Sequence, residues 1–159
     1  MELRILRETD QALVLEMLTD EQIKQTYMLP DFSTREDALP LFRRLVQLSR
    51  NGSHFVRGIC DGDVLVGFLN DVQTENGCIE LGYVIHPRHW GKGYATEGLK
   101  LALEELARLG YRKAITGAFP ENKASLRVME KACMVPVPGT DTVEYRGKQH
   151  TCRYFEKEL

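Results

Sequence analysis

The segment from Glu80 to Thr96 constrains the fold of this chain more than any other part of the sequence. An apolar run with strand-like alternation leads to Pro87, then to two closely spaced glycines, Gly91 and Gly93, and then to a helical pattern. Proline cannot continue a central strand. Glycine allows the backbone to bend tightly and to approach a ligand closely. The segment therefore predicts a strand, a glycine turn and an amphipathic helix in immediate succession.

The helix that follows this turn is expected to begin at an anion site. Its first N–H groups have no partner within the helix, and the positive end of the helix dipole lies at the same place. Arg88 and Lys92 add full positive charges beside it, which favours a phosphate ligand. The sequence contains no GxxxxGK[ST] loop, and residues 91–96 lack the last glycine of a GxGxxG fingerprint.

Turn residues and apolar periodicity place the other elements around this segment. Asp61-Gly62-Asp63 and Asn76-Gly77 predict two turns between strands. We expect strands over residues 3–6, 54–60, 64–72, 79–85 and 113–118, helices after residue 10 and over residues 33–52, 94–109 and 122–132, and a hairpin in the tail. Antiparallel strands, a strand–helix–strand unit and a final hairpin indicate an α+β domain with a mixed sheet.

Two helix starts carry specific signals. Thr9 or Asp10 is expected to cap the first helix with its side chain. The run Ser33-Thr34-Arg35-Glu36 fits a capping box for the second helix. Pro40 lies inside that second helix, so we expect a kink there or a later start.

Length and composition fit one domain over residues 1–159. No apolar run is long enough to span a membrane, and the N-terminus lacks a signal-peptide core. The net charge of −2 argues against nucleic acid as a partner. The cysteines are widely spaced, which favours reduced thiols in the cytoplasm. His86-x-x-His89 has no further ligands nearby, so we expect no metal site.

Two motifs carry a resemblance to a known family. The Arg88-x-x-Gly91-x-Gly93 spacing resembles the coenzyme A pyrophosphate loop of the GNAT N-acetyltransferases. The run from Asn122 to Lys131 resembles the second signature of that family, and it follows the next expected strand. The resemblance implies the GNAT fold: a central mixed β-sheet of about six or seven strands, flanked by about four helices and splayed at strands four and five.

Within that family, the chain is most similar to the ribosomal-protein-alanine and -serine N-acetyltransferases and their relatives. The matching runs are Glu80 to Tyr83, Trp90 to Glu97 and Glu144 to Lys148. The resemblance implies transfer of the acetyl group of acetyl-CoA to an amine by direct attack in a ternary complex. The acceptor is then a small-molecule amine or a protein N-terminus, and the protein a monomer or homodimer. A non-catalytic acyl-CoA-binding or regulatory module is the alternative.

The resemblance also assigns residues to the binding of acetyl-CoA. Asn122 is expected to contact the pantetheine arm, and a backbone N–H near Val84 and Ile85 to stabilise the oxyanion. The implied cofactor site consists of Val84, Ile85, His86, Arg88, Gly91, Lys92, Gly93, Tyr94, Ala95, Thr96, Asn122 and Ser125.

Proton transfer has several candidates. Glu144 matches a tail glutamate proposed as the base in the serine-acetylating branch, and Glu80 lies on the strand expected beside the thioester. Ser125 matches the hydroxyl proposed there as the acid toward the thiolate, while Met129 stands where many relatives have a tyrosine. An acyl-enzyme on Cys152, two residues after a histidine, is a weaker alternative.

Two further expectations concern the end of the last helix and the acceptor. Relatives usually have glycine at the position of Cys133, and a cysteine fits poorly in a left-handed helix end, so we expect another geometry there. Residues 1–79 have a net charge of −5, which favours a cationic acceptor. The carboxylates behind that expectation are Asp10, Glu16, Asp20, Glu21, Asp31, Glu36 and Asp37.

Overall fold

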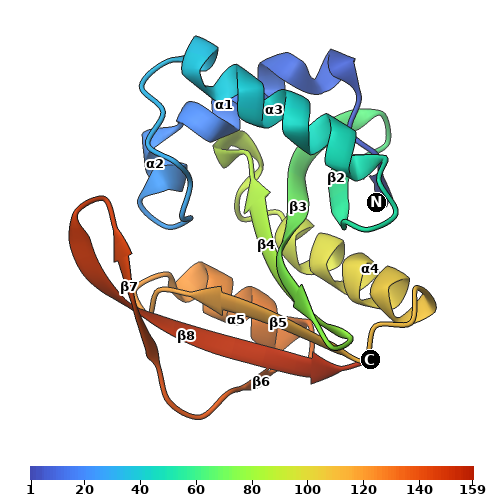
Figure 1. The fold of residues 1–159 in the computed structure, drawn as a ribbon, viewed down its shortest axis with the longest axis vertical. Helices are drawn as coiled ribbons and strands as arrows, with labels where there is room; N and C mark the ends of the chain where they lie inside the picture. Colours follow the sequence, from blue (N-terminus) through green and yellow to red (C-terminus); the bar gives the residue numbers. More distant parts are fainter.

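In the computed structural model, which describes all 159 residues, the strands form a mixed sheet in the order β1-β2-β3-β4-β5-β8-β6, with β7 paired to β8 (Figure 1). The strands are β1 (Glu2–Arg4), β2 (Val56–Asp61), β3 (Val64–Glu75), β4 (Cys78–Ile85), β5 (Lys113–Ala118), β6 (Val135–Pro136), β7 (Asp141–Tyr145) and β8 (Lys148–Glu158). All neighbours are antiparallel except β4 and β5, which are parallel. The predicted mixed α+β architecture is confirmed.

Helices cover both faces of the sheet. They are α1 (Gln11–Thr19), α2 (Glu21–Lys24), α3 (Arg35–Ser49), α4 (Tyr94–Arg108) and α5 (Lys123–Lys131), with short 3₁₀ turns at Glu8–Asp10 and Pro87–His89. One buried cluster joins α1 and α3 to β2 and β3, and includes Phe42 and Phe68. The other joins α4 and α5 to β4 and β5, and includes Leu81 and Leu103. None of the helices has the length and apolar composition needed to cross a bilayer.

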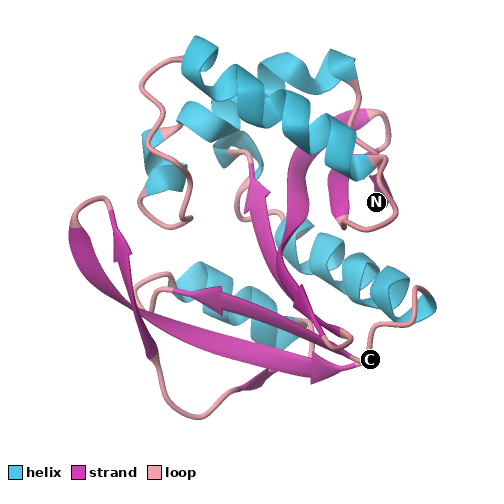
Figure 2. Ribbon diagram, viewed as in Figure 1, coloured by secondary structure: helices cyan, strands magenta, loops and turns pink.

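The sheet divides between β4 and β5. These strands pair only from Cys78 opposite Lys113 to Leu81 opposite Thr116. Beyond that point β4 stays paired to β3, and β5 stays paired to β8. Figure 2 shows β5 and β8 diverging at a steep angle from β4, so the upper end of β4 stands apart from β5. The predicted splay between these strands is therefore present.

Helix α3 starts within the run of residues predicted to cap it. The helix begins at Arg35, where the Thr34 hydroxyl accepts a hydrogen bond from the Asp37 N–H at 3.1 Å. Pro40 lies inside the helix, so the expected later start is wrong. The N–H that proline lacks would have bonded to the carbonyl of Glu36, which lies in the exposed first turn where water can solvate it.

Asp10 occupies the N-cap position of α1 but does not cap the helix with its side chain. Its carboxylate accepts two hydrogen bonds from the Arg4 guanidinium, both at 2.8 Å, and one from the Arg7 N–H at 2.7 Å. The predicted capping role is therefore wrong. The charged guanidinium and a preceding backbone N–H outcompete the helix for these oxygens.

The end of α5 also contradicts the prediction. Cys133 keeps the left-handed conformation, with a φ of +58°. Its N–H donates to the Glu130 carbonyl at 3.0 Å, and the Met134 N–H donates to the Met129 carbonyl at 3.1 Å. This pair of bonds is the Schellman arrangement, and Met134 is buried beside it. These contacts offset the roughly 1–2 kcal/mol that the left-handed conformation costs a residue with a side chain.

Candidate active site

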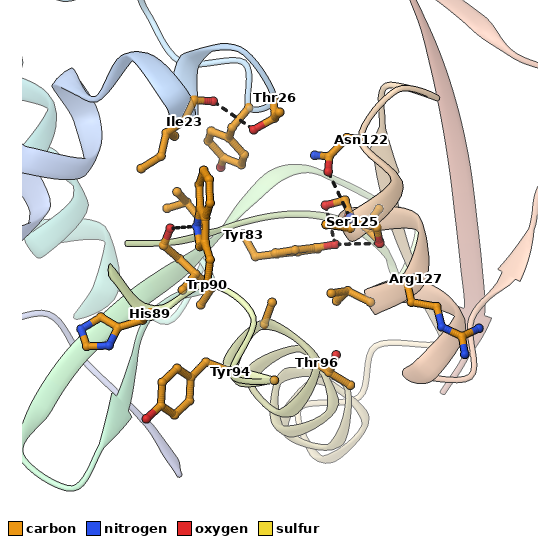
Figure 3. Close-up of a pocket in the computed structure, with 18 of the residues that line it drawn as sticks. Ile23, Thr26, Tyr83, His89, Trp90, Tyr94, Thr96, Asn122, Ser125 and Arg127 are labelled. Carbon is orange, nitrogen blue, oxygen red and sulfur yellow. Dashed lines mark hydrogen bonds between the residues drawn. The ribbon is translucent and has the colours of Figure 1, made fainter. Parts of the chain in front are cut away.

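A cavity of about 410 Å³ opens where β4 and β5 separate. Its wall is formed by the glycine turn, the first turns of α4 and α5, the ends of both strands, and α2 with the residues that follow it (Figure 3). Nine of the predicted cofactor residues line it: Val84, Ile85, Gly91, Gly93, Tyr94, Ala95, Thr96, Asn122 and Ser125. The two sequence motifs therefore meet at one cavity.

The glycine turn leaves one end of the cavity open to a ligand. Gly91 has a φ of +73° and Gly93 a φ of +83°, conformations that favour glycine. No atom lies within 4 Å of the place where a Cβ would stand at either residue. Gly93 precedes the first turn of α4, whose backbone N–H donors begin at Tyr94. These free donors and this open space fit the pyrophosphate of coenzyme A.

Behind the turn, His86 is held by two contacts. Its Nδ1 accepts the Arg88 N–H at 3.2 Å, so the neutral ring carries its proton on Nε2, which donates to Glu16 at 2.9 Å. That hydrogen bond lowers the pKa of Glu16, and Arg88 adds to the effect. His86 is buried and does not line the cavity, so in the structure it supports the turn from behind. Arg88 and Lys92 are exposed beside the turn and do not line the cavity either, and the Arg88 guanidinium lies 3.6 Å from Glu16.

The free edge of β4 faces the split in the sheet. The His86 N–H donates to the Val66 carbonyl on the β3 side. Because backbone groups alternate along a strand, the N–H and carbonyl of Ile85 point to the other side, toward β5. The Trp90 indole Nε1 donates to that Ile85 carbonyl at 2.7 Å, which confirms the direction. The Ile85 N–H is thus a donor aimed into the cavity.

A tyrosine and a serine meet across the cavity. The Tyr83 hydroxyl lies 2.9 Å from Ser125 Oγ, and the Ser125 N–H donates to Asn122 Oδ1 at 3.1 Å (Figure 3). Asn122 is therefore the predicted N-cap of α5. Burial raises the pKa of Tyr83 to about 12, although its hydrogen bond to Ser125 acts in the opposite direction. Both hydroxyls are protonated at neutral pH and able to donate.

Glu80 lies on the opposite face of β4 from Tyr83. It is two residues before Gly82, so the two positions share a face of the sheet. Burial raises the pKa of Glu80, and the negative charge of Asp141 on β7 adds to the effect. Neither carboxylate has a hydrogen bond or ion pair within the protein. Glu80 is thus a half-buried, unpaired carboxylate close to the split in the sheet, but it is not among the residues that line the cavity.

Comparison with known proteins supports this geometry. A family model described as the acetyltransferase (GNAT) domain matches residues 1–135. The chain belongs to the GNAT acetyltransferase family. This membership makes it an acetyl-CoA-dependent N-acetyltransferase and confirms the family and activity class predicted from the two motifs.

One curated relative and two solved structures illustrate the likeness. The uncharacterized N-acetyltransferase p20 of Bacillus licheniformis is 24% identical over 132 residues, which are 80% of this chain and 74% of p20. The acetyltransferase of Salmonella typhimurium that modifies the N-terminal serine of a 50S ribosomal subunit protein superposes with a TM-score of 0.85 at 18% identity, covering 99% of this chain and 94% of that one. Spermidine N-acetyltransferase from Vibrio cholerae, solved with CoA and spermine, superposes with a TM-score of 0.82 at 17% identity, covering 99% of this chain and 94% of that one. At these identities the two structures share the fold.

The tail residues considered for catalysis in this GNAT protein do not line the cavity. Glu144 is exposed on β7, and alternation places it on the opposite face from Tyr145, whose hydroxyl donates to the Tyr27 carbonyl at 3.1 Å. His150 does not activate Cys152, because its Nε2 lies 3.2 Å from the Tyr145 carbonyl and its ring stacks on Phe119. Burial raises the pKa of the Cys152 thiol. The cysteine is therefore poorly placed as a nucleophile.

Most of the carboxylates expected to attract a cationic acceptor have partners within the protein. Glu16 contacts His86, and Asp20 accepts the Ile23 N–H as the cap of α2. Glu21 and Asp31 both bind the buried Lys24. These carboxylates are thus mostly engaged in contacts within the protein rather than free to attract a ligand. The unpaired carboxylates near the split are Glu80 and Asp141 instead.

Several cavity residues were missed from the sequence, among them Tyr83, Trp90 and Tyr27. A signal existed for Tyr83, because it shares a strand face with the apolar Leu81 and so points toward the helix that carries Ser125. Trp90 lies inside the predicted glycine turn, where its indole Nε1 donates a hydrogen bond to the Ile85 carbonyl of β4. Tyr27 comes from the irregular segment after α2, and its position depends on tertiary packing that local patterns do not show.

Proposed function

We propose that the protein transfers the acetyl group of acetyl-CoA to a primary amine by direct attack in a ternary complex. The acceptor is a small-molecule amine or a protein N-terminus. One observation carries the proposal: a single cavity joins the phosphate-binding turn to a split strand edge that presents a free N–H. A second substrate can approach the thioester without a covalent intermediate on the protein.

The residues that would hold acetyl-CoA follow the long axis of this cavity. The N–H groups at the start of α4 bind the pyrophosphate, with Arg88 and Lys92 exposed beside the turn. The edge of β4 and Asn122 contact the pantetheine arm. When bound, acetyl-CoA supplies an acetyl group already activated as a thioester. The protein then has to orient the two substrates, exclude water and move two protons.

The Ile85 N–H is the donor proposed to stabilise the developing oxyanion. It is a rigid part of a paired strand and points into the split. A donor fixed before the reaction needs no reorganisation when charge develops, and such a donor contributes about 3–4 kcal/mol in other acyl transfers.

Glu80 is the proposed base. An acceptor amine is mostly protonated near neutral pH and must lose a proton before it attacks. The raised pKa of Glu80, caused by burial and by Asp141, makes it a better proton acceptor than an exposed glutamate. Its Cα lies two strand residues from Gly82, about 7 Å along the strand. We therefore propose that the proton reaches Glu80 through water.

Ser125 is the proposed acid toward the departing thiolate. It lies in the first turn of α5 and lines the cavity. The Tyr83 hydroxyl, 2.9 Å away, is placed to return a proton to Ser125 after it donates one, and Tyr83 then regains its proton from water in the open cavity. The pair thus takes the role that the tyrosine replaced by Met129 has in many relatives. Met129 itself is fully buried in the core.

The approach to the thioester on the Glu80 face is narrow, which favours a slim acceptor. The space next to Gly82 is filled by Tyr27. A Cβ at Gly117 would lie 2.7 Å from the Tyr154 ring and 2.9 Å from Cys152 Sγ. Because little room remains beside these two glycines, we expect a primary amine on an unbranched carbon to be a better acceptor than one on a branched carbon. Of the two solved relatives, the one named for spermidine takes an amine of this kind, whereas the N-terminal serine that the other modifies carries its amine on a branched carbon.

The test is release of free thiol from acetyl-CoA in the presence of a panel of amines. The panel contains polyamines, amino sugars, amino acids and short peptides with free or blocked N-termini. We expect amine-dependent thiol release and a mass gain of one acetyl group on at least one unblocked amine. If acetyl-CoA binds but no amine is acetylated, the protein is a non-catalytic acyl-CoA-binding module and the proposal fails.

A further inference from the structure

Trp90 is the only tryptophan of the chain, and it lies at the junction of the glycine turn and the split in the sheet. Its indole Nε1 donates to the Ile85 carbonyl at 2.7 Å, while 46% of the residue remains exposed. Figure 3 shows the ring standing in the cavity wall between Ile23 and Tyr83. A large aromatic side chain thus covers the free edge of β4 from the cavity side.

The covered carbonyl belongs to the backbone edge that a ligand in the cavity meets. The phosphate-binding donors of α4 and the edge at Ile85 line the same cavity. The pantetheine arm of coenzyme A is an extended chain with two amide groups. An extended amide chain next to a free strand edge pairs with it through backbone hydrogen bonds. Such a chain, anchored by its phosphates at Gly91 and Gly93, runs past Ile85.

We propose that Trp90 is a positioning residue for the edge of β4, whose indole N–H donates to the Ile85 carbonyl in the free protein. When an amide N–H of the pantetheine arm donates to that carbonyl, the indole moves away from it. This inference rests on the proposed binding of acetyl-CoA. A buried carbonyl without a partner is unfavourable, so the indole keeps the edge satisfied until the ligand arrives. One neutral hydrogen bond replaces another, so the exchange itself has a small free-energy change.

The exposure of Trp90 and its main-chain contacts allow the indole to move away from the Ile85 carbonyl. Nearly half of the side chain is exposed, so the ring can turn outward without opening the core. The following residue is Gly91, which has a φ of +73° and open space where a Cβ would stand, so it does not crowd the ring. The main chain of Trp90 stays fixed, because its N–H donates to the Pro87 carbonyl at 3.2 Å.

The single tryptophan makes the exchange directly measurable. Wild-type protein is titrated with coenzyme A and, as a matched control, with its nucleotide half, phosphorylated adenosine diphosphate without the pantetheine arm. Tryptophan emission is followed, and calorimetry measures binding independently. We expect coenzyme A to shift the emission to saturation at the calorimetric Kd. The nucleotide half, which carries the same adenine and phosphates, should bind and leave the emission unchanged.

The Trp90→Phe variant tests how much the indole hydrogen bond lowers the affinity for coenzyme A. Phenylalanine keeps a ring in the wall and removes the competing N–H, so coenzyme A should bind roughly two- to tenfold more tightly, the value of one neutral hydrogen bond. Weaker binding by this variant, or an equal emission change with the nucleotide half, overturns the inference. Calorimetric binding of coenzyme A without any emission change overturns it and leaves the proposed function standing. Failure of coenzyme A to bind at all rejects both.

Discussion

At one end of the cavity the binding groups belong to the backbone, and at the other end they are side chains. The turn around Gly91 and Gly93 offers N–H donors and open space, and its basic side chains are exposed beside it. The split end offers the Ser125 hydroxyl on one face of β4 and the Glu80 carboxylate on the other. The Ile85 N–H is the backbone donor proposed to act at this end.

This difference separates binding from chemistry. A phosphate group is charged throughout the reaction, so backbone donors that hold it stabilise the bound substrate and the transition state equally. Protons move only during the reaction, and moving them needs groups with suitable pKa values. Substitutions at the split end should therefore change kcat, and substitutions at the turn should change the affinity for acetyl-CoA.

The largest effect is expected for Glu80→Gln. Loss of the base should lower kcat about 10²–10⁴-fold, with little change in the Kd for acetyl-CoA measured by calorimetry. A base must be unprotonated to act, so wild-type kcat/KM should rise with pH through the pKa of Glu80. Because that pKa is raised by burial and by Asp141, the rise should come at a higher pH than for an ordinary glutamate. The rise should disappear in the variant.

Glu144→Gln is the matched control for this prediction. It removes the same charge from the exposed outer face of β7. Near-wild-type turnover is expected. If Glu144→Gln abolishes turnover while Glu80→Gln does not, the base is the tail glutamate, and the hairpin must move to bring it to the cavity.

Ser125→Ala should lower kcat within the same range but toward its lower end, about 10²-fold, because water can protonate a thiolate in part. Tyr83→Phe should have a smaller effect, since it removes only the group behind Ser125. If the two hydroxyls act as one relay, the double variant should be no slower than Ser125→Ala alone. Fully additive losses in the double-mutant cycle would show that they act separately.

The same contrast explains how much of the molecule the sequence predicts. The turn and its helix follow from local rules, since glycine and a helix N-terminus are visible in the chain itself. β5, at Lys113–Ala118, is found with its predicted bounds for the same reason. By contrast, the contact of Tyr83 with Ser125 joins residues 42 positions apart. The environment of Glu80 depends on Asp141, which a hairpin brings close.

Local rules also failed where tertiary contacts outweighed them. Asp10 has the residue type of a helix cap, yet Arg4 takes its carboxylate. Cys133 lacks the freedom of glycine, yet two backbone bonds and the burial of Met134 hold it in the left-handed region. The prediction of a cationic acceptor came from counting carboxylates over residues 1–79, but most of the carboxylates named for it have partners in the fold. Charge becomes informative only when partners are known.

Gly93→Val tests the end of the cavity at the glycine turn, where the binding groups belong to the backbone. A β-branched residue fits poorly at a φ of +83°, and its side chain would project into the open space expected to receive the pyrophosphate. We expect the Kd for acetyl-CoA to rise at least tenfold, about 1.4 kcal/mol, with kcat at saturation much less affected. Gly139→Val is the matched control, because Gly139 has a φ of +86° with equally open surroundings and does not line the cavity. Equal affinity in the two folded variants would remove the turn from the site.

The smallest effect is expected for Asp141→Asn, measured with an amine that the panel identifies as an acceptor. Asp141 is exposed on β7 and its negative charge raises the pKa of Glu80, so the same charge can act on a cationic acceptor through solvent. Interactions of exposed charges are weak, so kcat/KM should fall about two- to fivefold at low salt. Salt screens such interactions, and the difference from wild type should therefore shrink as ionic strength rises. Glu144→Gln, which removes a charge from the other face of the same strand, should show no such salt-dependent difference. If Asp141→Asn and Glu144→Gln use the acceptor equally well at every salt concentration, the charge of Asp141 does not attract it. Acceptors are then selected at the split end by the limited space near Tyr27 and Tyr154 rather than by charge.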